Sequence, residues 1–498
     1  MITRDRYAPS PTGLQHIGGV RTALFNYLFA KASGGAFILR LEDTDRSRFD
    51  PAYVKNLYDT FAWLGLYWDE GPDIGGPYAP YIQSERFALY RQYALELIDK
   101  DKAYYCFCSP ERLETVRSKR EAARSSETGY DRYCRAIKRD HAAKRAADGE
   151  PCVIRLKIPL DNTTRFHDQL LGDIEWQNND INPDPVLLKS DGFPTYHLAN
   201  VVDDHLMGIT HVLRAQEWLP STPLHVILYQ SFGWNPPAFC HLPMVMGQDG
   251  KKLSKRHGAT SVDEFRHQGY LPEALINYVA LLGASYIEGK DLYTLEELEV
   301  CFSLEKLNKA PAIFDYKKLE WYNGQYIRMK SDKDLAALAL PHAVDAGLFG
   351  QNNAAPDETQ GRAFIEAIPL IKERVSFLHE IPEKLRYLFA EPPLPETSEF
   401  LPKAMDIAKT IELLELGREL LEPLASRNDA DAEAFIKAYA ESHSVKLGNL
   451  MMPLRVALTG ARVSPPLFGT VRILGAHVSR ARVERALAAL RKVNGQIT

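Results

Sequence analysis

Cysteine is scarce in this sequence: only six occur among 498 residues, at positions 106, 108, 134, 152, 240 and 301. So few cysteines in so long a chain do not indicate a disulfide framework, which is typical of small secreted proteins. The sequence therefore excludes the disulfide-stapled class and predicts a reducing compartment, for which we expect the cytoplasm.

Long apolar runs and a strong excess of one charge are also missing. No apolar run approaches the roughly 20 residues that span a bilayer, and no secretory signal pattern precedes the first motif, so we expect no membrane partner. The net charge of −5 excludes a general polyanion-binding coat, so a nucleic acid would have to be bound by local basic patches. The hydrophobic (45%) and charged (25%) fractions are those of an ordinary globular protein, and the length predicts about three or four domains.

What the sequence does contain is a loop rich in proline and glycine, RYAPSPTGLQHIGG, in residues 6–19. A short segment ahead of it is typical of a strand. Apolar residues at helical spacing follow it and predict a helix: Val20, Ala23, Leu24, Tyr27 and Leu28. Backbone N–H groups at such a helix start suit an anionic ligand.

The loop fits neither of the two commonest phosphate-binding patterns. It has no Gly-Lys-Ser/Thr, as in a P-loop, and no Gly-x-Gly-x-x-Gly, as in a dinucleotide site. The His-x-Gly at residues 16–18 instead resembles the phosphate-contacting signature of class I aminoacyl-tRNA synthetases and related nucleotidyltransferases. Taken alone, a histidine near a glycine-rich turn is more often part of a simple capped loop.

The order of the following elements predicts an α/β fold. Residues 36–41 are typical of a buried strand and end in the acidic run Glu42–Asp45. In a parallel sheet, ligands bind beyond the carboxyl ends of the strands, where His16 and Glu42 would both lie. For Asp43 and Asp45, a solvated loop with helix-capping aspartates is the alternative interpretation. We further predict helices at 51–64, 84–100 and 222–232 and a strand at 152–158. The α/β pattern returns at 185–189 and continues to the apolar run at 239–246.

A charged, helix-prone region at 110–150 interrupts this pattern. We therefore predict a Rossmann-like parallel-sheet catalytic domain in two halves, 1–101 and 189–265, around an inserted α+β domain, 102–188. A connecting domain at 266–324 follows. Helical patterns dominate from about 325, with a proline-rich break at 391–396, so we predict two all-α subdomains, 325–390 and 391–498.

A second basic motif, KLSKR at residues 252–256, lies between Gly250 and Gly258. In isolation it would be read as a basic surface turn. Its order and spacing after the first motif match the late Lys-x-Ser-Lys loop of class I synthetases. Attack of a carboxylate on the α-phosphate of ATP builds negative charge, which a mobile lysine and a helix N-terminus can stabilise. We expect Lys255 to contact the phosphates and Lys252 to assist it.

Five ordered segments together resemble bacterial-type glutamyl-tRNA synthetases: residues 6–13, 40–45, 196–204, 214–218 and 252–256. The similarity continues to residues 446–460. The resemblance implies activation of glutamate by ATP with Mg²⁺, followed by transfer to the terminal adenosine of tRNA(Glu), in a monomer. It also implies that the inserted domain holds the acceptor stem and that the helical subdomains bind the anticodon. It leaves open whether tRNA(Gln) is also charged and whether activation needs bound tRNA.

The resemblance also implies roles for matching residues. The glutamate pocket would be formed by Arg6, Ala8, Ser10, Glu42, Tyr196, Asn200 and Arg214. The ATP site would be formed by His16, Gly18, Glu217, Trp218, Lys252, Leu253, Ser254, Lys255 and Arg256, with His16, Lys252 and Lys255 as its catalytic groups. The chemistry agrees, because Glu42 suits an ammonium and an arginine fork suits a carboxylate. Arg214 as a second arginine favours glutamate over glutamine. Alternatively, Tyr196 and Asn200 only pack on one helix face, and Arg214 forms a structural ion pair.

Two other functions remain open at this level. A tRNA-independent nucleotidyltransferase would not need the long helical C-terminal half. An inactive RNA-binding descendant would be expected to have lost the paired motifs, which are intact here. Within the resemblance, glutaminyl enzymes carry β-barrels in place of the helices, and a base-modifying relative lacks the C-terminal half. Gly19 stands where many class I enzymes have a second histidine, which we take as a family feature.

Cys106, Cys108 and Cys134 in the inserted domain could hold zinc, which takes four ligands at a closed structural site. Some members of the resembled family have a histidine or cysteine two residues after the third cysteine, where this chain has Ala136. The fourth ligand is left open between Tyr130, His141 and a water molecule. The alternative is three free cysteines.

Overall fold

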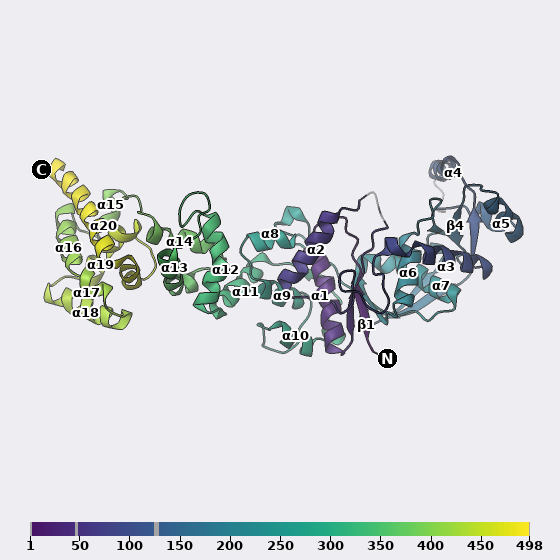
Figure 1. Cartoon of the computed structure of the whole chain (residues 1–498), viewed down its shortest axis with the longest axis horizontal. Coiled ribbons are helices and arrows are strands. Elements are labelled where there is room, and N and C mark those ends of the chain that lie inside the picture. Colours follow the sequence, from purple (N-terminus) through teal and green to yellow (C-terminus); the bar gives the residue numbers. More distant parts are fainter. Residues whose placement is uncertain (1, 45–47, 124–128, 498) are drawn as a thin grey trace. The chain divides into compact units, whose positions relative to one another are not determined.

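The computed structural model describes residues 2–44, 48–123 and 129–497, so that Asp45 lies outside the described residues. It contains two compact units, Met1–Phe265 with Leu275–Tyr316 and Arg266–Ala274 with Lys317–Thr498. The first is built on β-sheets, and the part of the second that is described is helical (Figure 1). No helix of the described chain is long and apolar enough to cross a membrane.

A parallel sheet forms the centre of the first unit. Its strands are β1 (Arg4–Tyr7), β2 (Ala36–Leu39), β8 (His211–Ala215) and β9 (Ala238–Leu242). β1 pairs with β2 and β8 with β9, both in parallel, and the Thr210 N–H donates to the Arg4 carbonyl over 2.9 Å beside β1. The predicted α/β architecture is therefore confirmed, with the β1-β2 pair beside the β8-β9 pair.

The predicted helices of this unit are present. α1 (Ile17–Ala32) joins β1 to β2 and is buried at ten of its sixteen residues. The other three predicted helices are α2 (Pro51–Leu64), α3 (Phe87–Asp99) and α7 (Thr222–Phe232). A further helix, α6 (Tyr196–Leu206), had no predicted bounds. The helix predicted from residue 84 starts as a 3₁₀ turn, Gln83–Arg86, before α3. The α6 helix places Tyr196 and Asn200 one turn apart, as their spacing predicts.

The sequence analysis missed a hairpin made by β5 (Thr163–Asp168) and β6 (Gly172–Gln177). These residues were assigned to the inserted domain. In the structure β5 continues the catalytic sheet, because Asp168 pairs with Phe239 of β9 in parallel. The hairpin thus extends the sheet to β6-β5-β9-β8. Its alternation of exposed and buried residues is too short to predict a partner so distant in sequence.

The rest of the insertion is α+β, as predicted. Its antiparallel sheet has the order β3-β4-β7, from β3 (Ala103–Cys106), β4 (Val153–Leu156) and β7 (Val186–Leu188). Its helices are α4 (Pro110–Ala122) and α5 (Arg139–Ala147). α4 buries none of its side chains, which explains its charged sequence.

Shorter elements complete the first unit and lead into the second: β10 (Val245–Met246), α8 (Val262–His267), α9 (Pro272–Ala280), α10 (Leu295–Cys301) and β11 (Ala312–Ile313). The helices that follow are α11 (Tyr316–Met329), α12 (Asp332–Asp345), α13 (Glu358–Ile371), α14 (Glu380–Phe389), α15 (Thr397–Phe400), α16 (Ile407–Glu419), α17 (Leu421–Ala425), α18 (Asp429–Ser442), α19 (Leu447–Thr459) and α20 (Leu467–Ile497).

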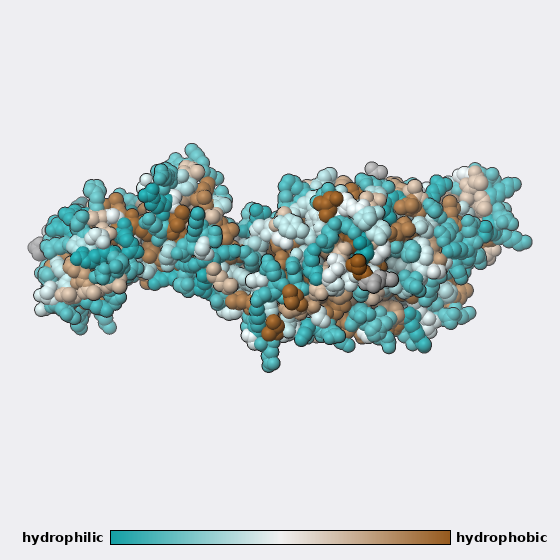
Figure 2. All heavy atoms as spheres, turned by 60° about the horizontal axis from the view of Figure 1, so that its bottom comes forward, coloured by the Kyte–Doolittle hydropathy of each residue, from teal (hydrophilic) through white to brown (hydrophobic). Residues whose placement is uncertain are grey.

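The second unit has its own apolar core, with fully buried residues such as Leu414, Leu454 and Leu487. α20 is interrupted at Gly475, whose φ of 75° is a left-handed conformation that glycine adopts easily. The predicted proline-rich break at 391–396 lies between α14 and α15. In both units hydrophilic side chains cover most of the face seen in Figure 2.

Candidate active site

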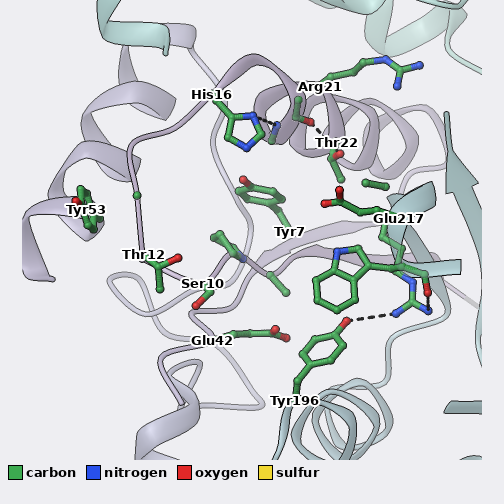
Figure 3. Close-up of a pocket in the computed structure, with 18 of the residues that line it drawn as sticks. Tyr7, Ser10, Thr12, His16, Arg21, Thr22, Glu42, Tyr53, Tyr196 and Glu217 are labelled. Carbon is green, nitrogen blue, oxygen red and sulfur yellow. Dashed lines mark hydrogen bonds between the residues drawn. The ribbon is translucent and has the colours of Figure 1, made fainter. Parts of the chain in front are cut away.

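A cavity of about 1450 Å³ opens at the carboxyl ends of β1, β2, β8 and β9 in the first unit. Figure 3 shows His16 at one end of it, Glu42 and Tyr196 at the other, and Tyr7 and Glu217 between them. All but one of the residues predicted for the glutamate and ATP sites line this cavity: Arg6, Ala8, Ser10, Glu42, Tyr196, Asn200, Arg214, His16, Gly18, Glu217, Trp218, Lys252, Leu253, Ser254 and Lys255. Arg256 is the exception, and its guanidinium lies 3.6 Å from Asp249 instead.

His16 is the N-cap of α1, because its Nδ1 accepts from the Gly19 N–H over 3.2 Å. Nδ1 is therefore unprotonated, and the ring proton sits on Nε2. Burial of the His16 ring away from water, and then the positive charge of Lys252, lower the pKa of His16. A neutral imidazole N–H thus stands beside the positive end of the helix dipole, which suits a phosphate.

The two glycines after His16 have steric reasons to be glycine. A Cβ at Gly18 would lie 3.1 Å from the His16 ring. A Cβ at Gly19 would lie 2.9 Å from the Tyr7 hydroxyl, which itself donates to Gln15 over 3.0 Å. Tyr7 thus occupies the space next to position 19, which explains why this chain has no second histidine there.

Backbone hydrogen bonds join the loop at residues 6–19 to the segment that follows the KLSKR motif. The Ile17 N–H donates to the Thr260 carbonyl, and the Val262 N–H donates to the Gln15 carbonyl, each over 3.0 Å. The KLSKR loop itself is closed by the Leu253 N–H, which donates to the Val245 carbonyl over 3.0 Å. Both motifs therefore face one cavity from opposite sides.

The lysines of the loop differ in their surroundings. The Lys252 ammonium lies 2.5 Å from the Glu217 carboxylate. The Lys255 ammonium, which is exposed, makes no hydrogen bond or ion pair with the residues that the structure describes. Lys255 is thus the loop cation that is ready to meet a phosphate, whereas Lys252 is shared with a carboxylate of the same cavity.

A network of buried charges forms the other end of the cavity. Asp204 accepts from Arg6 over 3.0 Å and from Arg40 over 2.7 Å. Burial alone would raise the pKa of the Asp204 carboxyl, but these two guanidiniums lower it. Arg40 also donates to Oε1 of Glu42 over 2.9 Å. The charge of Arg6 is therefore already compensated before any ligand arrives.

Glu42 keeps one oxygen for the cavity. Its Oε1 accepts from Arg40 and, over 3.3 Å, from the Asn200 amide, while Oε2 makes no hydrogen bond with described residues. Burial raises the pKa of Glu42 although Arg40 lies so close. A further cation at Oε2 would therefore be stabilising, and an ammonium group fits this position.

Arg214 is a buried cation, which an additional anion would stabilise. Only 5% exposed, it makes no ion pair with a described carboxylate within 4.0 Å. Its guanidinium donates instead to neutral acceptors: Thr222 Oγ1 (2.7 Å), His241 Nε2 (3.1 Å), Tyr196 Oη (3.3 Å), His225 Nδ1 (3.3 Å) and the Trp218 carbonyl (3.5 Å). Burial lowers its pKa. The predicted alternative of a structural ion pair is therefore wrong, and the buried cation lacks an anion.

The imidazoles near Arg214 predict a pH-dependent stability. Burial, then the charge of Arg214, lowers the pKa of His197 to about 4 and that of His225 well below 6.5. Both are neutral when folded, whereas unfolded imidazoles take a proton below about pH 6.5, so the stability is complete above that pH and is lost as the pH falls toward 4. Between about pH 7.5 and pH 5 we expect the free energy of unfolding to fall by about 2 kcal/mol per histidine.

Urea unfolding followed by tryptophan fluorescence measures this loss, because five of the six tryptophans lie in the first unit. His197→Asn keeps an acceptor at the Nδ1 position but cannot take a proton, and should reduce the loss by about 2 kcal/mol. Equal stability of the wild type at both pH values would contradict the neutral state of these rings.

Several residues that shape the site were missed by the sequence analysis. They are Tyr7, Arg40, Asp168, Asp204, Thr222, His225 and His241. Arg40 and Asp204 lie inside the quoted motifs, so their position next to Glu42 and Asn200 was a usable signal. Asp168 lies in the missed hairpin, His225 in a segment interpreted only as a helix and His241 in an apolar run, and nothing local distinguishes them.

The cysteine cluster lies away from this cavity, in the inserted region. The sulfurs of Cys106, Cys108 and Cys134 all lie within 4.8 Å of one another. The Tyr130 hydroxyl lies 3.3 Å from the Cys106 sulfur and 3.5 Å from the Cys108 sulfur. His141 is exposed on α5 and is not part of the cluster. Of the two side chains considered as fourth ligand, the geometry favours Tyr130.

Comparisons with known proteins agree with this geometry. Residues 3–321 match the family model of the catalytic domain of class I tRNA synthetases (E and Q), and residues 334–487 match an anticodon binding domain. A glutamate–tRNA ligase of Treponema denticola is 55% identical, over 98% of this chain and 99% of its own. One from Borrelia duttonii is 50% identical, over 98% and 96%.

A solved structure is similar over the same length. It is the crystal structure of a glutamate tRNA ligase from Elizabethkingia meningosepticum in complex with its amino acid. The TM-score is 0.85 at 36% sequence identity, with 98% of this chain and 100% of the other chain covered.

Proposed function

Because the chain belongs to the glutamate–tRNA ligases of the class I tRNA synthetases, we propose how its own residues activate glutamate with ATP and transfer it to tRNA(Glu). One observation carries the proposal: the cavity holds a buried arginine, Arg214, that has no carboxylate partner among the described residues. A buried cation without an anion is costly, so this cavity favours a ligand that brings a carboxylate.

In this proposal glutamate binds with its ammonium at Oε2 of Glu42 and its side-chain carboxylate at Arg214. The hydrogen bonds from Arg214 to Tyr196 and to the Trp218 carbonyl, at 3.3 and 3.5 Å, are long, and both partner residues line the cavity. A carboxylate can take their place, and the Tyr196 hydroxyl can then donate to it. Arg6, Ala8, Ser10 and Asn200 complete the proposed pocket.

ATP occupies the other end in this proposal, with its phosphates between the start of α1 and the KLSKR loop. Gly18, Glu217, Trp218, Leu253 and Ser254 line its place. Among the described residues, the one group of three or more histidine, cysteine or carboxylate ligands close enough to share a metal is that of the three cysteines. We therefore propose that Mg²⁺ arrives on the ATP phosphates, where it would neutralise part of their charge.

The α-carboxylate of glutamate then attacks the α-phosphorus in line, a new P–O bond forms, and the bond to pyrophosphate breaks. The His16 Nε2–H and the Lys255 ammonium stabilise the charge that moves onto the phosphate oxygens, and Lys252 assists when it leaves Glu217. A ribose hydroxyl of the terminal adenosine of tRNA finally attacks the carbonyl of the adenylate and releases AMP. Alignment of the two reactants supplies much of the remaining rate.

The remaining regions have proposed roles in binding tRNA. The inserted region 102–188 holds the acceptor stem and 266–324 contacts the stem. The helical subdomains 325–390 and 391–498 read the anticodon bases, which are unpaired and can be stacked and hydrogen-bonded. The match of residues 334–487 to an anticodon binding domain supports the last role. A monomeric, cytoplasmic enzyme is also proposed.

Attachment of labelled glutamate to purified tRNA tests the proposed function. We expect charging of tRNA(Glu), whereas no charging of any tRNA would overturn the proposal. The same assay with tRNA(Gln) tells whether the enzyme also charges that tRNA for later amidation.

We also propose a structural zinc ion on Cys106, Cys108, Cys134 and Tyr130. In a tetrahedral site with bonds of about 2.3 Å to sulfur and about 2.0 Å to oxygen, two sulfurs lie about 3.8 Å apart and oxygen and sulfur about 3.5 Å apart. The Cys108 and Cys134 sulfurs are 3.6 Å apart, and the Tyr130 oxygen lies 3.3 and 3.5 Å from two sulfurs. The donors therefore fit zinc without large movement.

Metal analysis of protein purified without chelator is expected to find about one zinc per chain, because the closed site contributes folding energy. Cys134→Ser should lose most of the metal. Tyr130→Phe should retain the three thiolates but bind more weakly. Less than about a tenth of an equivalent in the wild type would exclude the structural zinc.

A further inference from the structure

The guanidinium of Arg214 is held by a shell of imidazoles, His225 and His241, with His197 behind His225. Nε of Arg214 lies 3.1 Å from His241 Nε2, and one terminal nitrogen lies 3.3 Å from His225 Nδ1. His225 is 1% exposed and His241 is fully buried. Toward the cavity Arg214 donates to the Tyr196 hydroxyl over 3.3 Å, and Tyr196 lies at the same end of the cavity as Glu42 (Figure 3).

The tautomer of His241 follows from Asp168. Its Nδ1 lies 2.6 Å from the Asp168 carboxylate and must carry the proton, so Nε2 has a free lone pair for the Arg214 N–H. The charge of Asp168 is satisfied by this contact and by the backbone N–H groups of His241, Leu170 and Leu171. The carboxylate thus orients His241 and does not reach Arg214.

The tautomer of His225 follows from Arg214 itself. An arginine can only donate, so Nδ1 of His225 must be the acceptor and Nε2 must carry the proton. Nε2 lies 3.1 Å from Nδ1 of His197, which therefore accepts in turn. Each ring thus has one defined neutral tautomer that agrees with these hydrogen-bond partners.

We propose that His225 and His241 are specificity-determining positioning residues: they fix Arg214 through neutral acceptors and so leave its charge for the side-chain carboxylate of the amino acid. A carboxylate in either place would hold the guanidinium equally well. Such a carboxylate would also neutralise the charge of Arg214. An uncharged amino-acid side chain, such as that of glutamine, would then no longer bind more weakly than the carboxylate of glutamate. This inference rests on the proposed role of Arg214.

A matched pair of variants separates charge from shape. His225→Asn places a neutral acceptor near the position of Nδ1, and His225→Asp places a charged one of the same size there. In ATP–pyrophosphate exchange we expect the Asp variant to raise KM for glutamate about a hundredfold over the Asn variant, with kcat and the KM for ATP within about threefold. The preference for glutamate over glutamine should fall by a similar factor. Equal KM values for the pair would overturn the inference.

A third variant keeps this result separate from the proposed function. If Arg214→Gln leaves KM for glutamate unchanged, the role proposed for Arg214 fails. If Arg214→Gln raises the KM for glutamate but the two His225 variants have equal KM values, the role of Arg214 stands and only the inference about the histidines fails.

A second test observes the ring protons of the histidines directly in the wild-type enzyme. In ¹⁵N NMR spectra of histidine-labelled enzyme near pH 7, His241 should show a protonated Nδ1 and His225 a protonated Nε2. The signals can be assigned by their loss in His225→Asn and in the corresponding variant His241→Asn. A doubly protonated His225 or His241 would overturn the inference.

Discussion

Replacement of Arg214 by alanine is expected to lower kcat/KM for glutamate by roughly two hundred- to several thousandfold, which corresponds to about 3–5 kcal/mol. The reason is that the side-chain carboxylate of glutamate would then be buried without a cation. The described partners of Arg214 cannot replace it, because they are two imidazoles, two hydroxyls and a carbonyl. Pyrophosphate exchange with varied glutamate measures the effect.

Further measurements on Arg214→Ala serve as controls. KM for ATP should change little, because Arg214 lies at the amino-acid end of the cavity. Exchange with glutamine should stay near its wild-type level, so that the selectivity for glutamate collapses. The fold should survive, since the substitution removes a buried charge that no described carboxylate compensates. Unchanged glutamate kinetics would refute the role of Arg214.

Replacement of Lys255 by alanine is expected to lower kcat for adenylate formation by roughly a hundred- to a thousandfold. The exposed Lys255 ammonium has no described partner to leave, so it is the loop cation that can follow the phosphates as their charge changes. KM for glutamate should change little, since Lys255 belongs to the loop opposite α1. Single-turnover formation of adenylate separates this step from product release.

Lys251→Ala is the matched control for Lys255→Ala. Lys251 is an exposed lysine of the same loop, but it does not line the cavity. Replacement of Lys251 should leave kcat within about twofold, because the charge of an exposed side chain outside the cavity is screened by solvent. A similar loss in both variants would point to the general charge of the loop and against a specific role for Lys255.

The sequence was informative where function and local pattern coincide. The loop at residues 6–19 and the KLSKR motif carry glycines and charges in a spacing that local chemistry explains, and the structure places both on one cavity. Helix bounds were also accessible, because apolar spacing and caps are local signals. Residues 222–232, for example, were predicted with the bounds that α7 has in the structure.

The partners of the key charges could not be predicted in this way. Arg6 meets Asp204 across 198 residues, and His241 meets Asp168 across 73. Such pairs depend on which strands become neighbours, and the missed pairing of β5 with β9 is what brings Asp168 to His241. A single sequence shows that Arg214 is present. It does not show that the arginine is surrounded by neutral acceptors, and this surrounding is the basis of its selectivity.

The most direct test of this account is the ratio of kcat/KM for glutamate to that for glutamine in ATP–pyrophosphate exchange, measured with and without tRNA. If the uncompensated charge of Arg214 selects the amino acid, glutamate should exceed glutamine by at least about a hundredfold whenever exchange occurs. Exchange that requires tRNA would add a coupling between the bound RNA and this cavity. Equal exchange with glutamine, or a preference for it, would contradict the account.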